Sequence, residues 1–285
     1  MKKYKLVIKN FTLAMVIMVA QFCGNTPAAK PISTGYTAEL RGAPSFIVGK
    51  NVFDIILKNN GTPAPGVTLE VAPEMTMGSM FHGTPVDSVT DNGDGSYTVI
   101  AYMLMPSGMD SWTLHFHVNG QHIDSHIPIV VTGLMMDKAT FYGSSVNDLY
   151  VPDAMMPMTT SQRPYFVFKS ALTGAAPGQT LELYVSVRDN LMTHLPLVTG
   201  TALTTSMGSA VVGSVILNVY DANNTPISAT QVTGKPGYYT VTFSALNPVP
   251  TVTTLNLDLN VTLGTVAEQK VTSTTGAATM GTMNF

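Results

Sequence analysis

The stretch from Ser111 to Val131 places four histidines in a segment that has the pattern of a β-hairpin. Asn119-Gly120 is a strong signal for a two-residue turn, because both central positions of that turn favour φ > 0. Side chains alternate between faces along a strand, so a turn here predicts one apolar face and one polar face. The predicted pairs are Val118–Gln121, His117–His122, Phe116–Ile123, His115–Asp124 and Thr113–His126. The polar face then collects Thr113, His115, His117, His122, Asp124 and His126.

This polar face has the composition of a metal site. Directly opposed Cβ atoms in an antiparallel pair lie roughly 4.5–5.5 Å apart, so several imidazoles and a carboxylate come within reach of one ion. A single exposed histidine on a solvated sheet face needs no function. Five of the six histidines, however, fall between His82 and His126. This concentration favours a metal-binding surface over a set of ordinary polar residues.

A second candidate site lies in the Met-rich segment from Pro73 to Pro85, which is expected to be a loop. Thioether sulfur is a soft donor that suits Cu(I), and imidazole binds either oxidation state of copper. Met105 joins this set if the strand 96–105 pairs with 111–118 in even register, since methionines and histidines then share one surface. The alternative is that the methionines of that strand fill the core. The candidate ligands are Met75, Met77, Met80, His82 and Met105.

The composition predicts an all-β protein. Charged residues make up only 11% of the 285 positions, and apolar runs alternate with Gly, Pro and Asn turns. The length and the strand spacing indicate two tandem immunoglobulin-like β-sandwich domains. The expected boundaries are a first domain at 36–132, a Met-rich linker at 133–162, a second domain at 163–265 and a flexible tail at 266–285.

Two short motifs recur and support the duplication. Gly178-Gln179-Thr180 before an apolar strand resembles Gly49-Lys50-Asn51, and the run 237–241 (GYYTV) resembles 95–99 (GSYTV). Repetition of this kind predicts two domains of similar architecture.

Several functional classes are disfavoured. The formal net charge is −3 and no basic stripe is present, so nucleic acid is not an expected partner. The chain has no phosphate-binding glycine loop and no nucleophile elbow, and its one cysteine lies outside the predicted fold. We therefore expect no enzymatic activity.

The N-terminus has the pattern of an export signal. A lysine-rich start precedes an apolar stretch from Phe11 to Phe22, too short for a membrane span and suited to a secretory signal over residues 1–29. Cys23 follows directly and is a candidate for lipid attachment, which predicts membrane anchoring in the periplasm or at the cell surface. The alternative is a plain signal cleaved near Thr26, with Cys23 discarded.

Residues 36–131 resemble a family of exported domains. Five features follow one another along the chain: a Met-rich segment with His-Gly, a Gly-x-Gly-x-Tyr turn, a Met-containing strand, a Gly turn and a Trp strand. This order is similar to that of the YtkA-like and FixH-like sandwiches, and the architecture is similar to that of CopC-like copper carriers. The resemblance implies copper handling through Met75, Met77, Met80, His82 and Met105, with a copper transporter or an oxidase-assembly protein as partner. The matching segments are 75–83 (MTMGSMFHG), 93–97 (GDGSY), Met103, Met105, Gly108 and Trp112.

These observations lead to two hypotheses. The first is an exported copper-binding protein that sequesters or delivers Cu(I) or Cu(II) by ligand exchange, with zinc as an alternative metal at the histidine face. The second is a structural or adhesive surface lipoprotein with tandem sandwiches and no metal function. A redox enzyme with a catalytic copper is a weaker third alternative.

Overall fold

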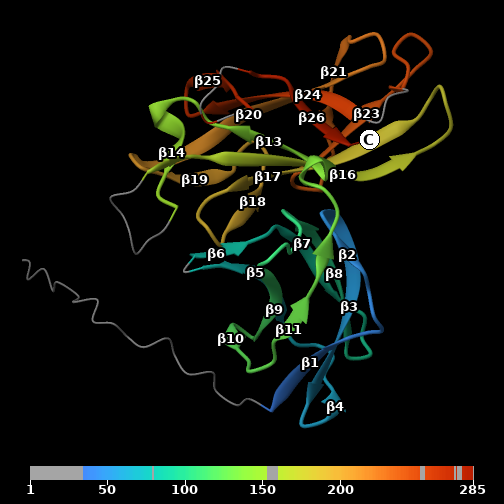
Figure 1. The fold of residues 1–285 in the computed structure, drawn as a ribbon, viewed down its shortest axis with the longest axis vertical. Coiled ribbons are helices and arrows are strands. Elements are labelled where there is room, and N and C mark those ends of the chain that lie inside the picture. The colour runs from blue at the N-terminus through green and yellow to red at the C-terminus, as the bar shows by residue number, and fades with distance from the viewer. Residues whose placement is uncertain are drawn as a thin grey trace, which may run out of the picture. The chain divides into compact units, whose positions relative to one another are not determined.

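The computed structural model describes residues 35–78, 80–152, 160–250, 254–272, 274 and 278–284. Within these ranges every regular element is a β-strand, apart from two short 3-10 helices, η1 (Met135–Asp137) and η2 (Val146–Asp148). None of the described helices is long and apolar enough to cross a membrane. The all-β prediction is confirmed, and Ile32–Phe285 forms one compact unit (Figure 1). The predicted export signal and Cys23 lie outside the described residues.

The first sandwich consists of two main sheets. One sheet has the order β1 (Tyr36–Leu40), β3 (Gly49–Asn59), β8 (Ser96–Met103), β7 (Val86–Asp91), with β4 (Thr62–Pro63) paired to β3. The other has the order β10 (Gln121–His122), β9 (Ser111–Val118), β5 (Leu69–Met77), β6 (Met80–Gly83), with β11 (Ile127–Ile129) paired to β9. A parallel pair, β2 (Phe46–Ile47) with β12 (Val131–Thr132), completes it. This is the A-B-E-D and C′-C-F-G strand order of an immunoglobulin-like sandwich.

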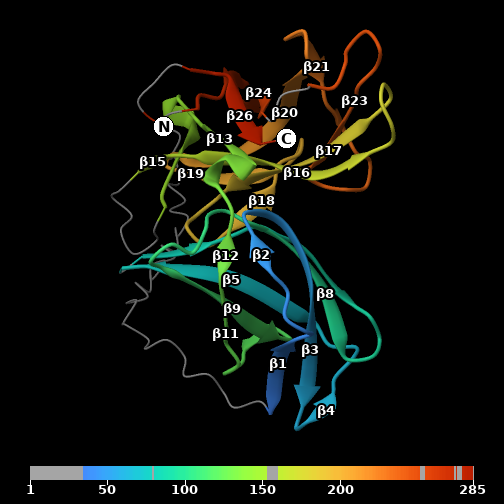
Figure 2. The same cartoon turned by 45° about the vertical axis from the view of Figure 1, so that its right-hand side comes forward.

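Strand β9 shows how the sequence pattern builds the core. Its burial alternates residue by residue: Trp112, Leu114 and Phe116 are fully buried, while the residues between them point away from the core. The neighbouring strand β5 alternates in the same way and contributes Met75 to that core. Figure 2 shows β5, β9 and β11 side by side in one sheet.

The hairpin at Asn119-Gly120 forms with the predicted inner register. Asn119 and Gly120 both have positive φ, at 51° and 75°, and the pairs Val118–Gln121 and His117–His122 are confirmed. Ile123 N also donates to Phe116 O at 3.1 Å, in keeping with the third predicted pair.

The outer pairs of the same hairpin were predicted wrongly. Ile127 faces Leu114 and Pro128 faces Thr113, a shift of two residues from the expected pairing. The extra residues are absorbed at Ser125, whose hydroxyl bonds the backbone of Ala38 in strand β1. Because the shift is even, every side chain stays on its predicted face.

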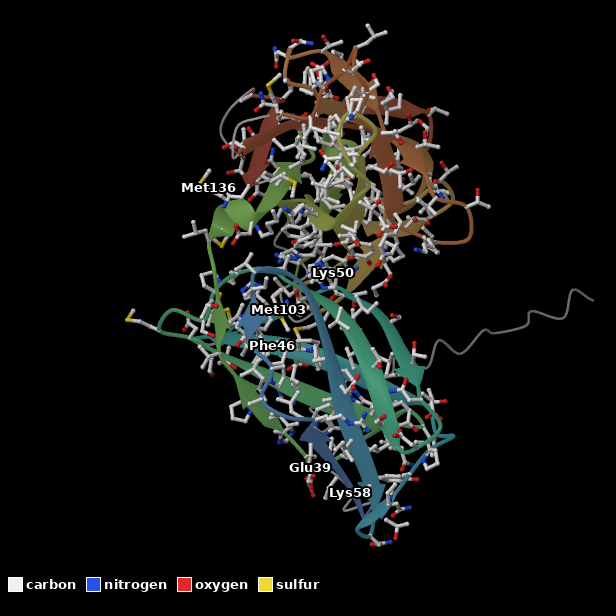
Figure 3. All side chains as sticks on the ribbon, turned by 90° about the vertical axis from the view of Figure 1, so that its right-hand side faces the viewer. Glu39, Phe46, Lys50, Lys58, Met103 and Met136 are labelled. Atoms are coloured by element: carbon white, nitrogen blue, oxygen red, sulfur yellow. The ribbon has the colours of Figure 1, made fainter. Side chains whose placement is uncertain are left out.

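Two other expectations for the first sandwich are corrected. Strand β8 pairs with β3 and β7 rather than with β9, and Met103 is fully buried in the core (Figure 3). The Met-rich segment is not a loop. It forms the antiparallel pair β5–β6, in which Met75 faces His82 and Met77 faces Met80.

The second sandwich repeats the immunoglobulin-like strand order and carries several further strands at its edges. Its first sheet has the order β13 (Lys138–Tyr142), β16 (Pro164–Thr173), β17 (Thr180–Arg188), β23 (Tyr238–Thr242), β22 (Thr230–Gln231), with β18 (His194–Pro196) paired to β17. Its second has the order β19 (Ala202–Thr205), β20 (Gly208–Tyr220), β24 (Thr254–Leu263), β25 (Val266–Gln269), with β21 (Pro226–Ser228) paired to β20 and β26 (Gly281–Asn284) to β24. A small separate pair joins β14 (Leu149–Tyr150) and β15 (Ser161–Gln162).

The repeated sequence motifs lead into or occupy equivalent strands. Gly49 begins β3 and Gly178 precedes β17, the B strands of the two sandwiches, and the GSYTV and GYYTV runs lie on β8 and β23, the E strands. In each sandwich these B and E strands pair directly, with Ile55 facing Tyr97 and Leu183 facing Tyr239.

The expected linker and tail both contribute strands to the second sandwich. Strand β13 lies within the predicted linker 133–162 and pairs with β16 along its whole length. Strands β25 and β26 lie within the predicted tail 266–285, and Met283 is fully buried in the second core. Both boundaries were wrong because the polar and small residues of these segments conceal short edge strands. Met155, Met156 and Met158 lie outside the described residues.

An aromatic cluster contains residues of both sandwiches. Tyr102 of β8 stacks on Tyr184 of β17 with ring centroids 4.3 Å apart. The hydroxyls of Tyr102 and Tyr238 lie 3.1 Å apart, and Tyr238 donates to Asp87 at 2.8 Å. Lys50, labelled in Figure 3, donates to Ser170 Oγ at 2.9 Å.

Candidate metal centre

The hairpin gathers its histidines on the outer face of the first sandwich. One ligand atom from each of His115, His122 and His126 lies within 4.8 Å of the others. The ring centroids of His115 and His126 are 4.7 Å apart, and those of His122 and His126 are 5.2 Å apart. His117 flanks the group, with its ring 5.2 Å from that of His122.

The closest pair of ring nitrogens has the spacing of two ligands on one ion. The Nε2 atoms of His122 and His126 are 3.4 Å apart. Two nitrogens bound tetrahedrally to one zinc ion at about 2.0–2.1 Å are separated by roughly 3.3–3.4 Å. The pair therefore needs little movement to bind an ion, and a ring nitrogen of His115 lies within 4.8 Å of both.

The cluster includes a carboxylate that the sequence interpretation missed. Glu74 Oε2 lies 3.6 Å from His115 Nε2, and both side chains are about a quarter exposed. Strand β5 brings Glu74 here by pairing with β9, so that Ala72 faces His115 and Glu74 faces Thr113. The signal was the alternation of Glu70, Ala72 and Glu74 along β5, but its use required the pairing of two strands far apart in the chain. The predicted carboxylate, Asp124, is exposed and is not one of the three clustered ligands.

The local environment favours the unprotonated imidazoles that a metal requires. Burial, followed by the nearby imidazoles of His126, His122 and His117, lowers the pKa of His115 to about 4. Burial and the same kind of repulsion lower the pKa of His122, although Asp124 opposes this shift. Burial raises the pKa of Glu74 against the influence of His117 and His126. The neutral imidazoles of His115 and His122 supply lone pairs without the cost of losing protons on binding.

Three of the four candidate methionines lie in or against the core and do not join this surface. Met75 is 2% exposed and lies in the first core, where it faces Trp112 across the sheet. Met77 and Met105 pack against the same core, and Met105 O accepts a hydrogen bond from Trp112 Nε1 at 3.1 Å. The expectation of one surface shared by methionines and histidines is therefore not met. For Met80 the structure describes the backbone position in β6 and not the side chain.

His82 is separate from the histidine cluster. It faces Met75 across β5–β6, and burial together with Arg188 of the second sandwich lowers its pKa. Its Nδ1 is buried without a hydrogen-bond partner among the described residues, as is Nδ1 of His194. His194 Nε2 lies 3.1 Å from Gly83 O, so these two histidines belong to the contact between the sandwiches.

Comparisons with known proteins give only weak likenesses. No family model matches the chain, and no curated protein matches it. The crystal structure of invasin, a bacterial integrin-binding protein, aligns with a TM-score of 0.26 and 14% identity over 88% of this chain and 40% of that one. The Escherichia coli adhesin FdeC aligns at 0.25 and 15% identity over 90% of this chain and 64% of its own.

A third structure, the Yersinia pseudotuberculosis adhesin InvE, aligns at 0.26 and 14% identity over 88% of this chain and 61% of its own. The chain thus spans less than two thirds of the length of each of these proteins. The immunoglobulin-like fold is established by the strand order rather than by these alignments.

Proposed function

We propose that this chain is an exported protein whose first sandwich binds a divalent metal ion through His115, His122 and His126. The observation that supports this most directly is the convergence of three ligand atoms within 4.8 Å on one outer face. Glu74 completes the donor set, as an additional ligand or as the hydrogen-bond partner that orients His115. The export signal expected at residues 1–29, with lipid attachment at Cys23, belongs to the same proposal.

The donor set favours Cu(II) or Zn(II). Imidazole and carboxylate suit these ions, whereas Cu(I) is selected by thiolate and thioether sulfur. Since Met75, Met77 and Met105 pack against the core, the Cu(I) site implied by the family resemblance has less support than the histidine site. Binding, sequestration and delivery by ligand exchange need no bond to be broken, so no catalytic residue is assigned. A copper transporter or an oxidase-assembly protein is the proposed recipient.

The alternative function, a structural or adhesive surface protein without a metal site, is favoured by a different observation. Two sandwiches of the same strand order share a buried aromatic cluster that includes Tyr102, Phe168, Tyr184 and Tyr238. Direct packing of this kind suits tandem domains that act as a spacer or present a binding surface. The two functions make opposite predictions for metal titration.

The decisive experiment is calorimetric titration of the purified mature protein with Zn(II) and Cu(II) against a competing chelator. We expect one ion per chain, bound more tightly than micromolar, and loss of that binding in His122→Ala and His126→Ala. The control is Asp124→Asn, which removes an exposed charge beside the cluster and should bind as the wild type does. Absence of binding tighter than micromolar would overturn the metal function and leave the structural alternative. Unchanged binding in both histidine variants would overturn the site.

A further inference from the structure

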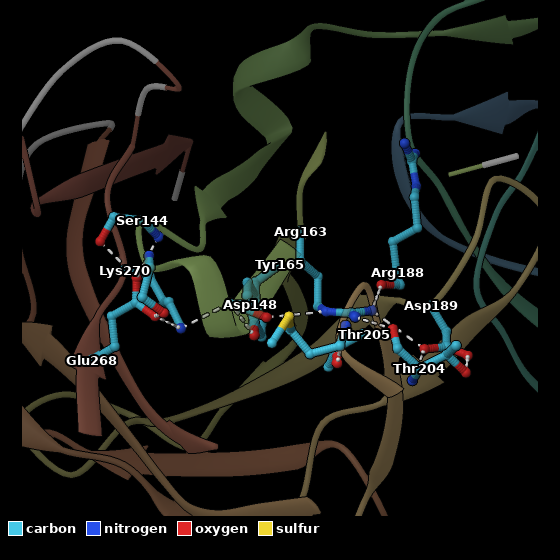
Figure 4. A network of polar contacts seen from close by, with 12 residues as sticks. Ser144, Asp148, Arg163, Tyr165, Arg188, Asp189, Thr204, Thr205, Glu268 and Lys270 are labelled. Atoms are coloured by element: carbon cyan, nitrogen blue, oxygen red, sulfur yellow. Dashed lines mark hydrogen bonds and ion pairs between the residues drawn. The ribbon is translucent and has the colours of Figure 1, made fainter. Parts of the chain in front are cut away.

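The second sandwich contains a buried network of charged side chains close to its core (Figure 4). The side chains of Asp148, Arg163 and Lys270 are each 0% exposed, and that of Glu268 is 10% exposed. Asp148 lies in η2, Arg163 directly precedes β16, Glu268 lies in β25, and Lys270 directly follows β25. Neither the metal site nor the aromatic cluster uses these residues.

The centre of the network is a contact between an amine and a carboxyl group. Lys270 Nζ lies 2.9 Å from Asp148 Oδ2 and 2.8 Å from Glu268 Oε2. Arg163 Nε donates to Asp148 Oδ1 at 3.1 Å, and the Tyr165 hydroxyl donates to Asp148 Oδ2 at 2.7 Å. The site is tightly packed as well as buried. A Cβ placed on Gly143 would lie only 2.0 Å from Asp148 Oδ2, so only glycine fits beside this carboxyl group.

We infer that Lys270 and Asp148 form an intramolecular isopeptide bond. The Lys270 amine, as its neutral form, attacks Cγ of the protonated Asp148 carboxyl group, and an Nζ–Cγ bond forms. Glu268 accepts a proton from Nζ and passes it to the departing Oδ, the Cγ–Oδ bond breaks, and one water molecule leaves. The products are a secondary amide and water, with no oxidant or reductant required.

Burial makes the reacting forms accessible. A proton moved from the Lys270 ammonium to the Asp148 carboxylate converts a buried ion pair into a neutral pair, which a dry interior disfavours far less than water does. The amine and the carboxyl carbon are held together by the fold, and well-oriented intramolecular reactions reach effective concentrations of roughly 10⁵–10⁸ M. Expulsion of the single product water favours the amide in a site that excludes solvent.

Glu268 is placed to carry the proton. Burial alone would raise its pKa, but hydrogen bonds from Lys270 and Ser144 outweigh this and lower it to about 2. An ionised carboxylate 2.8 Å from Nζ is in position to receive the proton that Nζ releases as the amide forms.

The charges that remain after the reaction keep their partners. Condensation removes one positive and one negative charge, so the net charge of the network is unchanged. Arg163 retains Asp189 at 3.3 Å and the carbonyl oxygen of Arg188 at 2.6 Å. Glu268 retains hydrogen bonds from Ser145 N and Ser145 Oγ, at 2.7 and 2.9 Å. No buried charge is left alone, which is the condition that such a network has to satisfy.

The bond would close most of the second sandwich into a covalent loop. Asp148 and Lys270 are 122 positions apart in the chain, so the amide joins the segment before β14 to the segment after β25. Cross-links over long loops constrain the unfolded chain most strongly. This inference is independent of the metal proposal, and its test does not involve metal.

Mass spectrometry of the purified full chain tests the inference. We expect the denatured wild-type protein to be lighter than its sequence mass by one water, and proteolysis to release a branched peptide that joins Lys270 to Asp148. Lys270→Arg and Asp148→Ala should restore the full mass. Glu268→Gln should retain the water in most molecules, since the proton carrier is absent.

An exposed pair provides the internal control. Lys58 Nζ lies 2.8 Å from Glu39 Oε2, as close as the buried contact, but the two side chains are 30% and 54% exposed (Figure 3). Peptides that contain these residues should be recovered unlinked. The inference is overturned if the wild type has its full mass and the Lys270 and Asp148 peptides separate on proteolysis. That result is obtained on the wild type, so it stands even if a variant fails to fold.

Discussion

The outer face of the first sandwich and the buried network of the second use similar side chains in opposite surroundings. In both, basic and acidic groups from separated strands meet within hydrogen-bonding or near-bonding distance, such as 3.6 Å for His115–Glu74 and 2.9 Å for Lys270–Asp148. The first group is partly open to solvent, whereas the Lys270–Asp148 contact of the second is fully buried. Solvent access decides whether such a group exchanges an ion or is restricted to reactions among its own atoms.

The difference also appears in how each group is supported. The histidines lie on one hairpin and contact a single glutamate, Glu74 of β5. The position of this glutamate depends on the pairing of β5 with β9. The residues of the buried network come from η2, from β25 and its end, and from the start of β16. Hydrogen bonds join Asp148 to Arg163 and to Lys270, and Lys270 to Glu268. Loss of one member should therefore matter far more in the second sandwich than in the first.

Replacement of Arg163 by Met is expected to have the largest effect. The substitution removes the donor to Asp148, Asp189 and the carbonyl oxygens of Arg188 and Thr204. Removal of one partner from a buried charged network typically costs about 3–5 kcal/mol. Urea unfolding followed by circular dichroism should show this loss in the second sandwich. The fluorescence of Trp112, the only tryptophan, should report little change in the first. A cost below 1 kcal/mol would show that the network is not tightly coupled.

Acid should weaken the two regions in different pH ranges. In the folded, metal-free protein the pKa of His115 is lowered from 6.5 to about 4. As the pH falls, His115 therefore takes up a proton in the unfolded chain before it does so in the folded one. The stability that neutral His115 contributes, roughly 3 kcal/mol at most, is complete above pH 6.5 and lost as the pH falls towards 4. In the chain before the Lys270–Asp148 amide forms, Glu268 has a pKa lowered from 4.5 to about 2, so its contribution is complete above pH 4.5 and lost towards 2.

Fluorescence of Trp112 and the methyl NMR signals of the second core measure the two losses separately. His115→Gln is the control for the first range, and it should reduce the pH dependence between 6.5 and 4 to the part that His122 and His82 contribute. A single acid transition shared by both probes would contradict the separation.

A smaller effect is expected from Glu74→Gln. The amide keeps the size of the side chain but loses the charge that faces His115. Removal of an outer partner of a metal ligand typically weakens binding by about 10–100-fold. Competition titration with Zn(II) measures the change. The matched control is Glu70→Gln, which lies on the same face of β5 opposite His117 and should bind nearly as the wild type does. Equal losses in the two variants would mean that general negative charge, rather than the His115 contact, supports the site.

The smallest effect is expected from Arg41→Met on the surface of the first sandwich. Arg41 lies 3.2 Å from Asp94 and 3.5 Å from Asp54, but its side chain is 47% exposed. Exposed ion pairs of this kind contribute about 0–1 kcal/mol. Urea unfolding monitored by Trp112 fluorescence should shift only slightly. A loss comparable to that of Arg163→Met would show that exposure is not what separates the two regions.

Much of the fold could be predicted from local pattern. Alternation along 111–118 and the Asn119-Gly120 turn gave the two faces and the inner register of the hairpin correctly. The outer register failed because Ser125 bonds Ala38, a residue of another strand. The linker and tail were misassigned because β13, β25 and β26 are short edge strands, and the partners of β13 and β26 do not adjoin them in the chain.

The candidate site was predicted in part for the same reason. The four histidines were placed on one face because they share a hairpin, and side-chain alternation is a local property. Met75 was assigned as a ligand, but the same alternation on β5, once paired with β9, turns it towards Trp112 in the core. Glu74 could not be selected without that pairing.

By itself, the sequence determined the all-β class, the duplicated architecture and the histidine face, since each follows from periodicity over a few residues. Only the tertiary structure decided which acidic groups meet which bases. The contacts of Glu74 with His115 and of Asp148 with Lys270 join residues 41 and 122 positions apart, and no local pattern specifies which distant strands become neighbours. The same packing leaves the histidine face partly exposed and buries Asp148 and Lys270. This difference in exposure separates a surface that can exchange an ion from an interior that holds an amine and a carboxyl group in contact.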